Sequence, residues 1–256
     1  MAVSFVTCIK LMPRYETFAL RLKLYIENVA LGCRTFGVPF EIIVVEECDS
    51  KNVAFVSLPE AFLVDHNARL IKYAPTYANP HGYNIVEAYA KNVGLAQAKH
   101  EYTCITNCDV LFNAAFFEHL LCLKPKVLYR FLENETGPVD DWALTLAEAL
   151  QMGEKGKCIN AQLMDKGKWT VRGIAYKAGD AMLVDTATWR QIKGFPENNV
   201  WIHSDLIVVL VLNNNGVGLD VPPAARVYTS PHERPSAEQP FELKKAFEYE
   251  SKRACN

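Results

Sequence analysis

The stretch Glu101–Phe112, EYTCITNCDVLF, indicates how the rest of the chain is arranged. Its first half is apolar and reads as a buried strand, which ends at Asn107 and is followed directly by Asp109. In open α/β sheets, ligands bind in the crevice at the carboxyl ends of the strands. Asn107 and Asp109 are therefore candidate ligand-binding residues. The alternative is that they form a turn and cap a helix over Ala114–Leu123.

A carboxylate beside an amide at a strand end suits a hard divalent cation, which prefers oxygen ligands. Mg²⁺ in particular is usually held by one or two carboxylates together with the phosphates of a substrate. Asp109 is accordingly the candidate ligand for Mn²⁺ or Mg²⁺, and a diphosphate is the candidate partner of that cation.

The composition is that of an ordinary globular protein. Of 256 residues, 50% are hydrophobic and 22% are charged, which provides ample material for a core. The formal net charge of −2 gives no electrostatic reason to expect binding to nucleic acid or to an anionic membrane.

The cysteines and the apolar runs bear on the compartment. None of the eight cysteines forms a CxxC pair, and the first residues lack the pattern of a signal peptide. The longest apolar run, Leu206–Leu212, is too short to cross a bilayer. We therefore expect reduced thiols, a cytoplasmic location and at most peripheral contact with a membrane.

Alternating strand and helix patterns predict an α/β fold. Val3–Ile9 and Phe40–Val45 are apolar runs typical of buried strands, and a helical stripe runs from Tyr15 to about Gly32 between them. Right-handed β-α-β connections favour a parallel sheet. Further strands are expected at Arg69–Tyr73, Lys126–Phe131, Ile174–Val184 and Ala225–Thr229, and further helices at Asn84–Ala98, Asp141–Met152, Thr186–Ile192 and Ser204–Asn215.

Two segments are less clear. Val53–Val64 is ambiguous between helix and strand, and the polar, Gly- and Lys-rich segment Gly153–Gly173 reads as a surface loop. No internal repeat or low-complexity linker divides the chain, so we expect one compact domain.

Five segments in order resemble the GT-A-fold glycosyltransferases, and the pattern is most similar to the large inverting, family-2-like group of sugar transferases. The segments are VSFVTCIK (3–10), EIIVVEECDS (41–50), AYAKNVGLAQAKHEYTCITNCDVLF (88–112), YKAGDAMLVDTATWRQIKGFPE (176–197) and HSDLIVVLVLNNNGVGLDVPPAARVY (203–228). The resemblance implies a single Rossmann-like domain with a central, mostly parallel sheet flanked by helices. It also implies a nucleotide-binding half (1–112) and an acceptor-binding half (113–235). The end of the chain (236–256) is charged and helix-prone, and it predicts a C-terminal helical tail.

The resemblance implies where the nucleoside binds. Thr7 and Cys8, at the end of the first strand, would lie beside the base. Glu46 or Glu47 would accept a hydrogen bond from the base or the ribose, as a carboxylate can. The alternative is that these two acids only solvate the end of their strand.

The resemblance also assigns residues near the diphosphate. Lys91 stands where an arginine is common and Asn92 matches as it is, so both are expected near the nucleotide; a surface lysine is the alternative. Asn107-Cys108-Asp109 stands at the Asp-x-Asp position, with Asn replacing the first acid. Asp109 would bind the metal, and Asn107 would contribute a carbonyl oxygen or a ribose contact. With one negative charge fewer the metal should bind more weakly, and a metal-independent variant is the alternative.

Four further residues complete the implied site. Gly179 and Asp180 resemble a turn that approaches the donor sugar, although an ordinary strand bulge is the alternative. Asp205 stands in an acidic motif at the start of a helix, where Ser204 replaces the usual Glu, and is the candidate general base. The alternative is a carboxylate that only stabilises the helix N-terminus. His232 is a candidate metal ligand, with a packing or surface role as the alternative.

These residues predict a glycosyltransferase that moves a sugar from a UDP- or GDP-sugar to the hydroxyl of a glycan or another acceptor. The reaction would be assisted by Mn²⁺ or Mg²⁺ and would invert the anomeric centre. One alternative is a non-catalytic module that binds a nucleotide-sugar or carbohydrate. A sugar nucleotidyltransferase is less favoured, because the segment after the first strand, CIKLMPRYE (8–16), lacks the expected glycine-rich loop.

Overall fold

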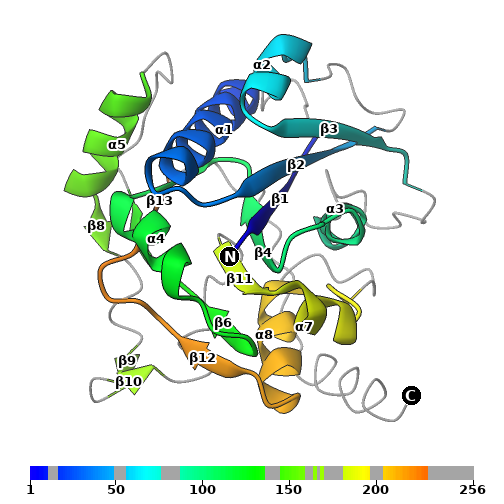
Figure 1. The fold of residues 1–256 in the computed structure, drawn as a ribbon, viewed down its shortest axis with the longest axis vertical. Coiled ribbons are helices and arrows are strands. Elements are labelled where there is room, and N and C mark those ends of the chain that lie inside the picture. The colour runs from blue at the N-terminus through cyan, green and yellow to red at the C-terminus, as the bar shows by residue number, and fades with distance from the viewer. Residues whose placement is uncertain are drawn as a thin grey trace, which may run out of the picture.

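The computed structural model describes residues 1–10, 17–48, 56–75, 87–135, 145–158, 164–165, 168–169, 181–196 and 204–229. These residues form a large sheet, a smaller sheet and a two-stranded hairpin, with helices on both faces of the large sheet (Figure 1). Among the described helices, none combines the length and the apolar character needed to cross a bilayer.

The large sheet has seven strands in the order β12-β6-β11-β4-β1-β2-β3. They are β1 (Val3–Ile9), β2 (Phe40–Glu47), β3 (Ala68–Tyr73), β4 (Tyr102–Asn107), β6 (Val127–Tyr129), β11 (Ala181–Asp185) and β12 (Gly218–Asp220). Strands β3, β2, β1 and β4 are parallel, and β11 runs antiparallel to β4 and β6. The apolar runs of β1 and β2 are buried along their whole length, as expected for strands covered on both faces. The predicted central, mostly parallel sheet is confirmed.

Helices cover the two faces of this sheet with two separate cores. The helices are α1 (Thr17–Thr35), α2 (Glu60–Asp65), α3 (Glu87–Ala96), α4 (Ala114–His119), α5 (Leu146–Lys155), α7 (Thr186–Gln191) and α8 (Ser204–Asn214), and a 3₁₀ turn, η2 (Leu120–Cys122), follows α4. Helices α1 and α4 pack on one face, and α3, α7 and α8 pack on the other. Figure 1 shows α1 and α3 on opposite sides of β1 and β2.

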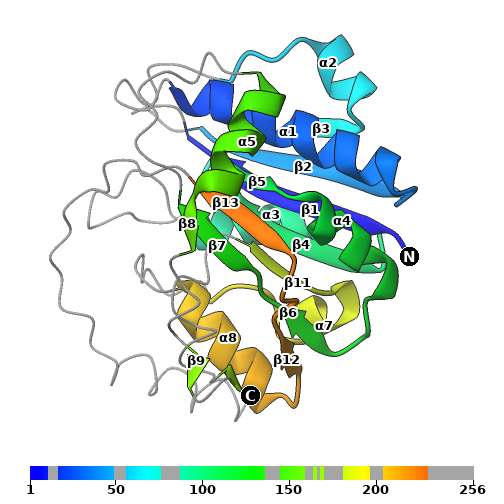
Figure 2. The same cartoon turned by 90° about the vertical axis from the view of Figure 1, so that its left-hand side faces the viewer.

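A smaller sheet joins the two halves of the chain. Its strands, in the order β5-β13-β7-β8, are β5 (Val110–Phe112), β13 (Arg226–Thr229), β7 (Leu132–Glu135) and β8 (Lys157–Cys158), and the hairpin consists of β9 (Met164–Asp165) and β10 (Lys168–Trp169). Helix α5 lies against β13 and β5 (Figure 2) and contributes Ala149 to a small core with Leu111 and Tyr228.

The structure differs from the sequence prediction in several places. The strand expected at Lys126–Phe131 is limited to β6 (Val127–Tyr129), and the next strand, β7 (Leu132–Glu135), belongs to the smaller sheet. The chain changes sheets at Arg130, whose backbone N–H bonds to Asp220 and whose buried guanidinium donates to the carbonyl of Ala181. The expected surface loop Gly153–Gly173 contains β8, β9 and β10, and the ambiguous Val53–Val64 contains the start of α2.

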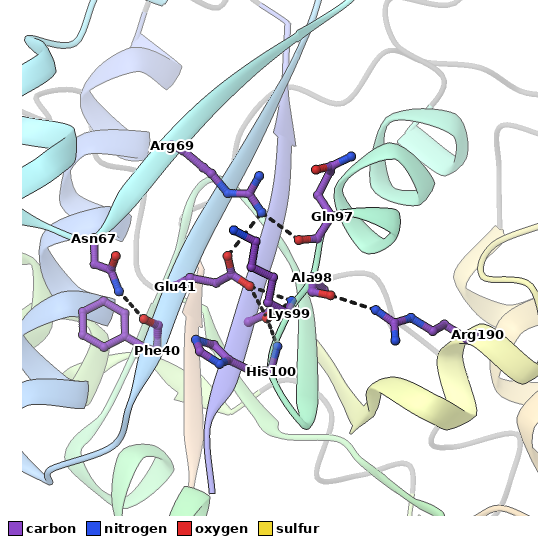
Figure 3. A network of polar contacts seen from close by, with 10 residues as sticks. Phe40, Glu41, Asn67, Arg69, Gln97, Ala98, Lys99, His100 and Arg190 are labelled. Atoms are coloured by element: carbon purple, nitrogen blue, oxygen red, sulfur yellow. Dashed lines mark hydrogen bonds and ion pairs between the residues drawn. The ribbon is translucent and has the colours of Figure 1, made fainter.

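A buried polar network fastens the amino ends of the parallel strands (Figure 3). The Glu41 carboxylate accepts hydrogen bonds from Ser4 Oγ at 2.7 Å and from the backbone N–H of Lys99 at 2.8 Å. Arg69 Nη2 bonds to the same carboxylate at 3.2 Å and to the carbonyl of Gln97 at 2.7 Å. Glu41 therefore connects β1, β2 and β3 to the turn between α3 and β4.

We expect Glu41→Gln to destabilise the protein by about 1.5–3 kcal/mol at pH 7, the usual value of hydrogen bonds to a charged group. Burial alone would raise the pKa of Glu41, but the bonds from Ser4 and Lys99 and the charge of Arg69 outweigh it, and the pKa is lowered. A carboxyl with a lowered folded-state pKa contributes stability above the unfolded pKa of about 4.3, and this contribution is lost as pH falls through the folded value. Urea unfolding from pH 7 to pH 3 should show a shallower pH dependence for the variant.

The matched control is Glu101→Gln, since the side chain of Glu101 is 68% exposed and only 4.0 Å from the amino terminus as its ion-pair partner. The control should change stability by less than about 1 kcal/mol. Equal effects of the two substitutions would contradict the role of Glu41.

Candidate functional site

The carboxyl edge of the parallel strands brings several predicted residues together. In the register of β1 and β4, Cys8 is the direct neighbour of Asn107, and Thr7 is the neighbour of Thr106. Cys8 is buried, and burial is the main reason that the pKa of its thiol is raised. This edge lies at the opposite end of the strands from Glu41.

Lys91 is the centre of a buried cluster at this edge. Its side chain is 3% exposed, and Nζ donates to Glu87 Oε2 at 2.7 Å and to Asn107 Oδ1 at 3.2 Å. Burial lowers the pKa of Lys91, but the negative charges of Glu87 and Asp205 and the hydrogen bond to Glu87 oppose burial, and the pKa is raised. The side chain is therefore a buried ammonium, and the alternative of a surface lysine is wrong.

Asp205 reaches the same cluster from another part of the chain. It lies in the first turn of α8, is partly buried, and is close enough to raise the pKa of Lys91. The Lys91 ammonium on α3 thus contacts Asn107 on β4, and Asp205 on α8 adds a negative charge in its surroundings.

Asp109 lies just beyond β4, before β5, and its partner comes from the other face of the sheet. Its Oδ2 is 3.4 Å from Arg21 Nη1 on α1, and the two side chains are only 8% and 6% exposed. Burial lowers the pKa of Arg21, an effect that the charge of Asp109 opposes. The cap of α4 is Asn113, whose side chain accepts from the N–H of Phe116, so the alternative that Asn107 or Asp109 caps this helix is wrong.

Arg21 is a residue that the sequence reasoning missed. It follows Phe18 by three positions and precedes Tyr25 by four, so it falls on the apolar stripe of α1. Its guanidinium lies 5.1 Å from the centre of the Phe18 ring. A charged residue on a buried stripe needs a partner, and this signal could have identified Arg21 from the sequence.

The described residues do not build a metal centre around Asp109. Among them, no three His, Cys, Asp or Glu side chains are grouped so that they could hold a metal ion by themselves. The carboxylate of Asp109 faces the guanidinium of Arg21. The side-chain oxygen of Asn107 already accepts a hydrogen bond from Lys91. A divalent ion there would be repelled by the charges of Arg21 and Lys91. Two unit charges 4 Å apart repel each other by roughly 4 kcal/mol at an effective dielectric constant of 20.

The two acids at the end of β2 have different surroundings. Glu47 forms a buried ion pair with Lys10 at 2.8 Å. Glu46 Oε1 accepts from the N–H of Val56 at 2.6 Å, while the buried Oε2 has no hydrogen-bond partner among the described residues. Burial raises the pKa of Glu46. The buried Thr7 Oγ1 is likewise without a partner in the described part. Glu46 therefore has the oxygen better placed to accept from a ligand.

Asn92 holds the turn that follows α7. Its Nδ2 donates to the carbonyl of Phe195 at 2.9 Å, and its Oδ1 accepts from the N–H of Phe195 at 2.7 Å. Phe195 stacks on Trp189 with ring centres 5.6 Å apart, and the Lys91 ammonium lies 5.7 Å from the centre of its ring. Asn92, expected near the nucleotide, is thus engaged with this backbone, which positions an aromatic wall beside Lys91.

Three predicted site residues lie outside the described residues: Gly179, Asp180 and His232. Their assigned roles stay predictions.

Comparisons with known proteins identify the fold. No protein-family model matches the chain, and no curated protein matches it in sequence. The structure is similar to S. aureus TarS 1–349 in complex with UDP, with a TM-score of 0.58 and 15% identity over 100% of this chain. It is also similar to the same TarS segment in complex with UDP-GlcNAc, with a TM-score of 0.53 and 13% identity over 100% of this chain.

The chain spans 66% and 67% of these two TarS chains. At this level of identity the likeness establishes the fold alone. The chain has a GT-A glycosyltransferase-like fold, as its resemblance in sequence implied.

We expect Gly194→Ala to disrupt the contact between Asn92 and Phe195. Gly194 has φ +70°, and an added Cβ would overlap Asn92 Oδ1. Gly216 provides the control, because its φ is +74° but a Cβ there would meet no atom within 4 Å. Both alanine variants carry the cost of a left-handed backbone, about 1–2 kcal/mol. Gly194→Ala should lose roughly 1–2 kcal/mol more, the value of one or two hydrogen bonds.

The free energy of unfolding in urea measures this difference. In an Asn92→Ala background the two glycine substitutions should become nearly equal, because the overlapping atom is gone. A difference that persists in that background would contradict the explanation.

Proposed function

We propose that the chain is a glycosyltransferase that transfers a sugar from a nucleotide-diphosphate sugar to an acceptor hydroxyl. The observation that carries the proposal is the cluster at the carboxyl edge, where Asn107 contacts the Lys91 ammonium and the charge of Asp205 acts on the same group. In open α/β sheets, ligands bind at the carboxyl ends of the strands. A transfer there needs a base for the acceptor hydroxyl, and Asp205 on α8 is the candidate. The fold of a protein crystallised with UDP and with UDP-GlcNAc supports the nucleotide-sugar as donor.

The donor would lie along the carboxyl edge from β2 to β4. Glu46, which has an oxygen without a partner in the described part, would accept a hydrogen bond from the base or the ribose. Thr7 and Cys8 on the intervening strand β1 would border the nucleoside. The diphosphate would then fall at the end of β4, next to Asn107.

Asp205 would act as the general base. Its carboxylate would take the proton from the acceptor hydroxyl while the hydroxyl oxygen forms a bond to the anomeric carbon. The bond from that carbon to the diphosphate oxygen breaks, and the nucleoside diphosphate leaves with the electron pair. Attack from the face opposite the leaving group inverts the anomeric centre.

Mn²⁺ or Mg²⁺ at Asp109 does not enter this scheme, because the described residues do not fit a metal centre there. The donor sugar, the base and the acceptor are the parts of the proposal that a screen of UDP- and GDP-sugars would define.

We expect Asp205→Asn to lower kcat for transfer or donor hydrolysis about 100-fold or more, the usual contribution of a general base. The affinity for UDP should stay within threefold of the wild type, because the amide keeps the shape of the side chain. The measurements are turnover of a panel of UDP- and GDP-sugars and UDP binding by calorimetry.

Asp65→Asn, at the exposed end of α2, is the matched control and should leave both quantities unchanged. A turnover within threefold of the wild type in Asp205→Asn would refute the assignment of the base. Binding of UDP without turnover of any donor would favour the non-catalytic module.

A further inference from the structure

Each polar member of the Asn107-Cys108-Asp109 motif holds a buried basic side chain. Asn107 Oδ1 accepts from Lys91 Nζ at 3.2 Å, and Asp109 Oδ2 lies 3.4 Å from Arg21 Nη1. The two bases come from α3 and α1, which cover opposite faces of the sheet. The motif therefore stands between two cations that belong to the protein itself.

Both cations are fixed in place by burial and by their partners. The exposed fractions of the Lys91 and Arg21 side chains are 3% and 6%. A buried charge is retained only when it is paired, and Glu87 and Asp109 provide the opposite charges. Their location is thus set by the fold and does not depend on an ion from solution.

Charge decides between two roles for Asp109. As a metal ligand, its carboxylate would be the source of the attraction for a divalent ion. As an anchor for Arg21, its carboxylate offsets a guanidinium whose flat fork matches the geometry of a phosphate group. The ion pair and the neutral Asn107 agree with the second role.

We propose that Arg21, anchored by Asp109, and Lys91, anchored by Asn107, take the place of a divalent cation toward the diphosphate of the nucleotide. This inference rests on the proposed function and specifies how its donor is bound. Nucleotide binding is then independent of divalent metal.

The two ends of the Arg21–Asp109 pair give substitutions of opposite effect. Arg21→Gln removes the positive charge of the guanidinium and leaves the negative charge of Asp109. Binding of UDP therefore weakens at least tenfold. Uridine, which has no phosphate, keeps its affinity within threefold and reports that the variant is folded. Asp109→Asn removes the negative charge and keeps the guanidinium, so UDP binds as tightly as to the wild type or more tightly.

The experiment is calorimetry of UDP and uridine binding to the full chain in 5 mM EDTA and in 5 mM MnCl₂. The wild-type affinity for UDP should differ less than threefold between the two conditions. Arg34→Gln, at an exposed arginine further along α1, is the matched control and should bind UDP like the wild type.

Three results would overturn the inference: a tenfold loss of wild-type UDP binding in EDTA, a tenfold loss in Asp109→Asn, or unchanged UDP binding in folded Arg21→Gln. In each case UDP still binds the wild type, and the proposed function survives. Absence of UDP and uridine binding in both conditions would remove this inference and the proposed function together. Should Arg21→Gln fail to fold, the wild type in EDTA and Asp109→Asn still decide.

Discussion

Compensation of buried charge at one edge of the sheet is the constraint on which the site depends. The Lys91 ammonium is almost fully enclosed, and an enclosed ammonium is tolerable only with acceptors and negative charge around it. Glu87 on the same helix, Asn107 on β4 and Asp205 on α8 meet that need. Three elements from separate parts of the sequence are therefore drawn to one point, which is also where a parallel sheet receives its ligand.

Much of the fold could be predicted from the sequence because the central strands carry a strong local signal. The largely apolar runs of β1 and β2 and the helical stripe of α1 predict the β-α-β start, and β4 ends at Asn107 as expected. The signal fails where a segment is short or divided between sheets. β5 and β12 have three residues each, which is too short to show the alternation of apolar and polar residues typical of a strand. The residues next to Arg130 likewise give no signal that the chain passes from one sheet to the other there.

The site was predictable as a set of positions more than as a set of contacts. The resemblance selected Lys91, Asn92, Asn107 and Asp205, and the structure brings three of them together while Asn92 faces the backbone of Phe195. A partner more than eighty residues away cannot be read from spacing, so Arg21 escaped notice beside Asp109. Likewise, the ion pair between Glu47 and Lys10 becomes apparent only from the register of β2 with β1.

Helix α3 is secured at both of its ends. The turn after it is tied to Glu41, Arg69 and Arg190 through the backbone of residues 97–99, and its first turns hold Asn107 and Phe195. We expect a helix held at both ends to keep its position and orientation when other parts of the chain are changed. This makes α3 a fixed reference for protein engineering, in which other positions are exchanged and the hydrogen bonds of α3 are kept.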